Sequence, residues 1–257
     1  MANVTNIKSI AEFFLISIAW TLTLFSPIAS TRLTGNGFIK LISNISIGSL
    51  ATALVVSFFS TNYFGMPFYL KLISLFALVS ITLFHQDDKS LMMWLMYAMV
   101  TCSLGFHLVL FYPLFLNSLF LISSALLLGI ILYSMVLGHW YLVVPKLSER
   151  PLKVAAILTW VILGFKIICS LLATYQHYDF FEQQTTLGSG YAFNWLLLTM
   201  RISFGYLVIL GMSLFNWKLV KMRSIQSSTG ILYAMTFFIF IGELVSLFIF
   251  FNYGLFI

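Results

Sequence analysis

The feature that most constrains the fold is a series of apolar segments, each long enough to cross a lipid bilayer. These segments lie at 10–30, 38–60, 66–85, 90–112, 117–144, 151–176, 189–217 and 229–256. A helix rises about 1.5 Å per residue, so roughly 20 apolar residues cross a hydrocarbon core of about 30 Å. The segments are continuous, whereas a β-barrel needs short segments of alternating polarity. The sequence therefore predicts an all-α, polytopic membrane helix bundle with about eight transmembrane helices.

The connections between these segments are short, which leaves no room for a soluble domain. We expect one transmembrane helical domain over residues 1–257, in keeping with 61% hydrophobic residues, 8% charged residues and a mean hydropathy of +1.04. The sequence has no Walker, Rossmann, HExxH, CxxC, CxxCH or GxSxG motif. Common soluble-enzyme chemistries therefore have no support, and the catalytic residues, if there are any, are not identified.

The basic residues of the connections predict the orientation. One side has Arg32, Lys40, Lys89, Lys146, Arg150, Lys153, Lys218, Lys221 and Arg223, and the other has only Lys8 and Lys71. By the positive-inside rule, both termini face the outer, periplasmic side of a bacterial-type inner membrane. The net charge of +6 reflects this asymmetry, so we do not expect nucleic-acid binding. Glu12 interrupts the first apolar segment, which we expect to stay in the mature protein.

Four ionisable residues lie deep in the predicted helices. Counted from the predicted cytoplasmic ends, their depths are roughly 21, 22, 24 and 25 Å for Glu243, Lys166, Arg201 and His107. Ionisable groups are costly in a bilayer, so they normally pair with one another or line a site. Asn194, seven residues before Arg201, shares its helix face. We therefore predict a polar, ligand-binding layer in the outer half of the bilayer.

This layer has two interpretations. In the structural one, Arg201 and Glu243 form a buried ion pair that fixes helix packing, while Lys166 reaches a carbonyl or the outer surface. In the functional one, two cations and one carboxylate leave an excess of positive charge. That excess favours a quinone carbonyl, a haem propionate, a lipid phosphate or a small anion. A neutral Lys166 would require no charged ligand.

The four histidines raise the possibility of haem b. His107 and His177 lie in the outer half, and His85 and His139 lie near the cytoplasmic ends of their helices, so only these two pairings place both rings on one side. A lone histidine in an apolar segment is more often a hydrogen-bonded core residue. His107 and His177 are therefore weak haem-ligand candidates, and no other metal site is predicted.

The predicted cytoplasmic face has further candidates. The segment 138–146 contains His139 beside two aromatic residues, and it is typical of an interfacial anchor, although a proton or head-group contact at His139 stays open. Lys221 and Arg223 precede the last helix, whose N-terminus could hold a phosphate. Helix capping and orientation are the simpler explanation for these residues.

Three functions fit these features. The first is a membrane subunit of an electron-transport complex, such as a respiratory chain, which binds a quinone-like or haem-like ligand and contacts membrane lipid and other membrane subunits. The second is a small proton-coupled transporter of an anion, in which Glu243 carries the proton. The third is a non-catalytic assembly subunit. His107 in the layer and an aromatic content of 18% favour the first, while the absence of a recognisable internal repeat weighs against the second.

Overall fold

The structure, a computed structural model, describes residues 2–29, 34–58, 65–84, 90–110, 114–144, 147–176 and 191–256. Throughout these residues the regular secondary structure is helical. The helices are α1 (Ala2–Phe25), α3 (Asn36–Phe58), α4 (Met66–Phe84), α5 (Leu91–Leu110), α6 (Phe115–Val143), α7 (Arg150–Gln176), α9 (Tyr191–Ile202), α10 (Val208–Lys221) and α11 (Ile225–Tyr253). Eight spans in this part of the chain are long and apolar enough to cross a membrane. The prediction of an all-α, multi-pass membrane protein is confirmed.

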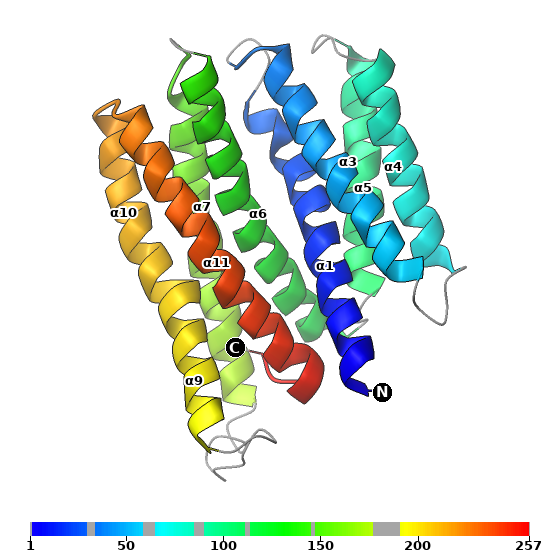
Figure 1. Ribbon diagram of the computed structural model, residues 1–257, viewed down its shortest axis with the longest axis vertical. Coiled ribbons are helices and arrows are strands. Elements are labelled where there is room, and N and C mark those ends of the chain that lie inside the picture. The colour runs from blue at the N-terminus through cyan, green and yellow to red at the C-terminus, as the bar shows by residue number, and fades with distance from the viewer. Residues whose placement is uncertain are drawn as a thin grey trace.

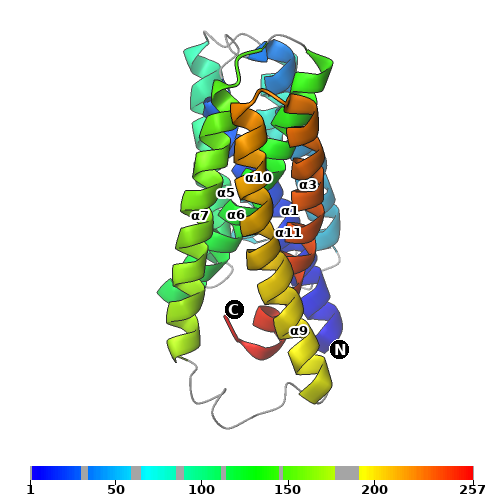
Figure 2. The same ribbon diagram turned by 90° about the vertical axis from the view of Figure 1, so that its left-hand side faces the viewer.

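The helices run roughly side by side, and both ends of the chain lie toward the same end of the bundle (Figure 1). A five-residue π-helix, Ser203–Leu207, joins α9 to α10, so these three elements form one long span. Figure 2 shows this span beside α7 and α11. A one-turn 3-10 helix, Ser26–Ile28, ends the first span.

Helix α6 is the central element, because it packs against α1, α7 and α11. Two of its serines, Ser123 and Ser134, remain compatible with an apolar surrounding because their hydroxyls bond to carbonyls about one turn earlier. Ser123 donates to Phe120 O at 2.6 Å, and Ser134 donates to Ile130 O at 2.7 Å. A Cβ atom at Gly129 would lie 2.0 Å from Thr21 Oγ1, so this glycine allows α1 to approach α6 closely.

The first and third spans differ from expectation in their polar residues. We counted Lys71 with the outer-side connections, but it lies within α4 and is 1% exposed. It is buried because Glu12 of α1 forms an ion pair with its ammonium group. A lysine whose charge is balanced can enter a helix bundle that would exclude it alone.

Candidate functional site

Arg201 and Glu243, the two residues of opposite charge in the predicted layer, are in direct contact. Arg201 of α9 is 0% exposed and Glu243 of α11 is 1% exposed. Arg201 Nη1 donates to Glu243 Oε1 at 2.9 Å and to the carbonyl oxygen of Gly242 at 3.3 Å. Two oppositely charged groups at one depth on neighbouring helices thus neutralise each other inside the protein.

The π-helix just after Arg201 brings Tyr206 to its guanidinium group. Arg201 Nη2 donates to the Tyr206 hydroxyl at 2.7 Å, and Arg201 Cζ lies 4.4 Å from the centroid of the Tyr206 ring. The two residues are five apart, a spacing that a regular α-helix does not place on one face. One wide turn corrects this mismatch, and such turns occur frequently at functional sites.

Two glycines allow the backbones to come together around this arginine. A Cβ atom at Gly242 would lie 2.6 Å from Gly205 Cα, and one at Gly205 would lie 2.5 Å from Arg201 Nη1. Any larger residue at either position would push α11 away from the π-helix or displace the arginine. The ion pair is therefore held by backbone contact as well as by charge.

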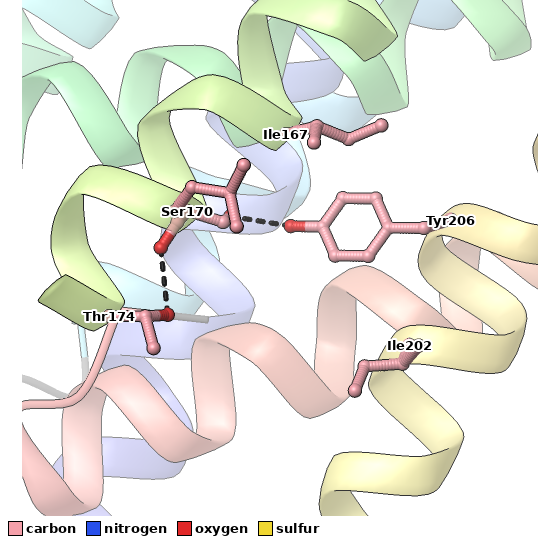
Figure 3. A pocket seen from close by; sticks show the side chains of 6 residues that line it. Ile167, Ser170, Thr174, Ile202 and Tyr206 are labelled. Carbon is pink, nitrogen blue, oxygen red and sulfur yellow. Dashed lines mark hydrogen bonds between the residues drawn. The ribbon is translucent and has the colours of Figure 1, made fainter. Parts of the chain in front are cut away.

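The Tyr206 hydroxyl continues the polar chain to α7 and to a pocket. It lies 2.5 Å from Ser170 Oγ (Figure 3). The pocket has a volume of about 250 Å³ and is lined by Ile167, Ser170, Leu171, Thr174, Ile202 and Tyr206. Leu171 and Ile202 are 65% and 46% exposed, so the pocket opens on the lipid-facing surface between α7 and α9.

The direction of the hydrogen bonds decides what the pocket offers. Arg201 can only donate, so the Tyr206 oxygen accepts from it, and in the bond between Tyr206 and Ser170 either hydroxyl can be the donor. The Thr174 hydroxyl donates to the backbone carbonyl of Ser170 at 2.8 Å. When Tyr206 donates to Ser170, the proton of the Ser170 hydroxyl is left for a group in the pocket, and the chain that begins at Arg201 strengthens it as a donor. The pocket thus suits a ligand that carries an acceptor oxygen.

Lys166 belongs to the same region but does not line the pocket. It is 0% exposed; its Nζ donates to Ser124 Oγ at 2.5 Å and to Phe120 O at 3.4 Å, and lies 3.4 Å from the centroid of the Phe120 ring. It is within electrostatic range of Glu243 and Arg201. The second oxygen of Glu243, Oε2, is buried and has no hydrogen-bond partner among the described residues.

His107 lies in a second cluster of ionisable residues. It is a buried residue of α5, within electrostatic range of Lys71, which pairs with Glu12. Helix α5 packs mainly against α1 and α4, whereas Arg201 and its partners are carried by α7, α9 and α11. The predicted layer is therefore divided between two helix groups.

Three of the predicted site residues fall wholly or partly outside what the structure describes. The side chain of Asn194 lies outside the described part of α9, and His85 and His177 lie outside the described residues. Each of the two haem pairings includes one of these histidines. The described residues contain no group of three or more His, Cys, Asp or Glu that could hold a metal ion.

At the predicted cytoplasmic end, residues 138–140 contact other parts of the bundle. His139 Nδ1 lies 2.7 Å from the Tyr233 hydroxyl of α11, and Trp140 Nε1 donates to Thr34 O at 2.8 Å. A Cβ atom at Gly138 would lie 3.0 Å from Thr229 Oγ1. Gly138 and His139, which an interfacial anchor would not require, thus have a role in joining α6 to α11.

Lys221 and Arg223 lie at the turn between α10 and α11. Lys221 Nζ lies 4.9 Å from the centroid of the Trp217 ring. Arg223 has φ 57°, and the bonds from Arg223 N to Val220 O and from Ser224 N to Leu219 O form a Schellman motif.

The Arg223 side chain also reaches the start of α7. It pairs with Glu149 at 3.2 Å. Hydrogen bonding to Lys153, with help from the charge of Arg223, holds the pKa of Glu149 below its ordinary value. This ion pair connects the end of α10 to the beginning of α7.

Comparison with known proteins gives no assignment: no family model, no curated protein and no solved structure matches this chain.

Proposed function

We propose that this protein is a membrane subunit that binds a lipophilic, quinone-like ligand in the pocket between α7 and α9. The observation that supports this is the polar chain from Glu243 through Arg201 and Tyr206 to Ser170, which ends at the pocket. A ring carbonyl would accept a hydrogen bond from the Ser170 hydroxyl. The apolar tail of the ligand would remain in the lipid along Leu171 and Ile202.

The size and position of the pocket support this ligand class. A cavity of roughly 150 Å³ accommodates benzene, so a pocket of about 250 Å³ has room for a substituted ring. Its walls are apolar apart from the hydroxyls of Ser170, Thr174 and Tyr206. A few placed polar groups in an apolar pocket are typical of small-molecule sites.

In this role the protein acts within an electron-transport complex, and partner subunits carry the redox centres. The proposal includes a bacterial-type inner membrane with both termini on the periplasmic side. The distribution of described basic residues supports this orientation: Lys40, Arg150, Lys153, Lys218, Lys221 and Arg223 lie at one end of the bundle. Because Lys71 is paired inside the bundle, Lys8 alone of the described basic residues remains at the other end.

A second candidate is the non-catalytic assembly subunit. It is favoured by the contact between Arg201 and Glu243, because charges that neutralise each other need no ligand. In that case the pocket holds ordinary lipid, and the polar chain serves only to fix α7, α9 and α11 together.

Lipid extraction and mass spectrometry of the purified protein test the proposal, together with titration of a decyl-substituted benzoquinone. We expect co-purified quinone and saturable binding that Ser170→Ala weakens about tenfold, the loss expected for one hydrogen bond of about 1.4 kcal/mol. Thr174→Val is the matched control, because its hydroxyl bonds to its own helix. Absence of saturable binding, or equal binding by the Ser170 variant, would leave the assembly role as the better account.

A further inference from the structure

The end of the bundle where α7 begins and α10 ends has more positive charge than its own carboxylates balance. The described basic residues there are Arg150, Lys153, Lys218, Lys221 and Arg223. The carboxylate of Glu149 pairs with Lys153 and with Arg223, each at 3.2 Å. One carboxylate therefore serves two cations, and no carboxylate of the described residues pairs with Lys221. Such a surplus of positive charge attracts anions at a membrane surface.

Two tryptophans lie next to these cations, where α7 and α10 pack side by side (Figure 2). The ring centroids of Trp160 and Trp217 are 5.4 Å apart, and Trp160 Nε1 donates to Ser213 Oγ at 2.8 Å. The Trp160 N–H is thus satisfied within the protein, and the ring is held against α10. Lys221 Nζ lies 4.9 Å from the centroid of the Trp217 ring. This cation–π contact keeps the ammonium group beside the indole pair.

Lys153 and Lys221 approach this indole pair from opposite helices. Lys153 lies seven residues before Trp160 and shares its helix face, as Lys221, four residues after Trp217, shares the face of Trp217. The two helices run in opposite directions, so both lysines lie on the same side of the indole pair. Their positions are roughly 10 and 6 Å from it along the helix axes. Two ammonium groups therefore converge at one edge of an aromatic surface.

We propose that the α7–α10 surface, formed by Lys153, Trp160, Trp217 and Lys221, binds the headgroup of an anionic phospholipid. Lysine ammonium groups bind phosphate oxygens as point charges, and indoles lie readily at the level of the lipid headgroups. An acyl chain follows the exposed apolar side chains beyond the indoles, which are Ile157, Val161 and Leu214. A lipid satisfies both the charged and the apolar part of this surface, whereas a free phosphate satisfies only the first.

Membrane orientation alone does not account for this arrangement. The positive-inside rule counts basic residues near the ends of the spans and places no condition on where their side chains point. Lys40 at the start of α3 illustrates this, since it is exposed at the same end of the bundle and takes part in no ion pair or ring contact among the described residues. The pocket that Ser170 lines is formed by other residues. Lipid binding here is therefore independent of the proposed quinone-like ligand.

Native mass spectrometry of the full-length protein tests the proposal, with phosphatidylglycerol and phosphatidylcholine of identical acyl chains. We expect one phosphatidylglycerol to bind at least tenfold more tightly than phosphatidylcholine. Lys221→Gln should lower this preference about fivefold, as expected from ~1 kcal/mol for one basic residue near a membrane surface. Lys153→Gln together with Lys221→Gln should abolish it. Lys40→Gln is the matched control, because it removes one charge from the same end and should keep the preference.

Three results of this experiment would overturn the proposal. Equal binding of the two lipids by the wild type would show that the surface holds ordinary lipid. An equal loss in Lys40→Gln and Lys221→Gln would show a general effect of net charge. Displacement of phosphatidylglycerol by millimolar inorganic phosphate would assign the lysines to a free anion.

Tryptophan fluorescence in liposomes locates the bound lipid. A small share of phosphatidylglycerol with brominated chains should quench the emission more than the same share of brominated phosphatidylcholine, because bromine quenches an indole that it contacts. The excess should disappear when Lys153→Gln and Lys221→Gln are combined, although Trp160 and Trp217 are still present, and it should persist in Lys40→Gln. An excess that survives in the double variant would place the lipid at another tryptophan and overturn the proposal.

Discussion

At the scale of single residues, the molecule balances its buried charges in pairs. Arg201 with Glu243 and Lys71 with Glu12 each place a cation beside a carboxylate. Breaking such a pair on one side leaves an uncompensated charge in an apolar surrounding, which is far more costly than removing both charges. Lys166 differs, because the groups that accept from its ammonium are a hydroxyl and a carbonyl.

The Arg201 and Glu243 pair should show strong energetic coupling. Arg201→Ala leaves a buried carboxylate, and Glu243→Gln should partly restore the lost stability in the double variant. We expect a coupling free energy of about 1–3 kcal/mol. Equilibrium unfolding of the four proteins in detergent gives this value, and strictly additive losses would show that the two groups are independent.

Lys166→Met should not lower the free energy of unfolding in the way that breaking an ion pair does. Methionine keeps the length and apolar packing of the side chain and removes the amine from a site that is 0% exposed. We expect a free energy of unfolding within about 1 kcal/mol of the wild type, or above it. Quinone retention should be unchanged, because Lys166 does not line the pocket. Loss of the ligand in a normally folded Lys166 variant would instead place this residue in the binding site.

At the scale of elements, the π-helix and the facing glycines determine the site. The wide turn at Ser203–Leu207 directs Tyr206 toward α7, while Gly205 and Gly242 let the span that contains it approach α11. The hydrogen bonds of Arg201 depend on this approach, because they reach the Gly242 carbonyl and Glu243 on α11.

Gly242→Ala should therefore destabilise the protein by about 1–3 kcal/mol, the usual cost of an added methyl group in a closely packed interior. Gly211→Ala in α10 is the control, because a Cβ atom there meets nothing within 4 Å. It should be neutral or stabilising by up to ~1 kcal/mol, since alanine favours the helix. Thermal unfolding compares the two, and equal effects would show that the contact between Gly205 and Gly242 is loose.

At the scale of the whole molecule, the charge asymmetry predicts the orientation. Met222→Cys and Met66→Cys place exposed thiols at opposite ends of the bundle, in a background without Cys102 and Cys169. A membrane-impermeant maleimide added outside intact cells should label position 66 and leave position 222 unlabelled until the membrane is opened. The reverse pattern would invert the orientation and place the pocket in the cytoplasmic half.

Hydropathy and length were sufficient to predict the fold class and the spans. In a bilayer every backbone polar group must be satisfied within the helix, so a long apolar segment has essentially one solution. The depth of each residue in the membrane could also be predicted from the sequence, because it follows from counting residues along a helix. That is why Arg201 and Glu243 could be assigned to one level before their contact was known.

Only the tertiary structure decided which residues of that level meet. Counting along helices gives one coordinate, whereas lateral neighbours depend on many weak packing contacts that no local pattern encodes. His107 was therefore grouped with residues carried by a different set of helices. Tyr206 was missed because a π turn, invisible in hydropathy, places it beside Arg201. The sequence by itself determined the spans and their depth, and the packing of the helices determined the site.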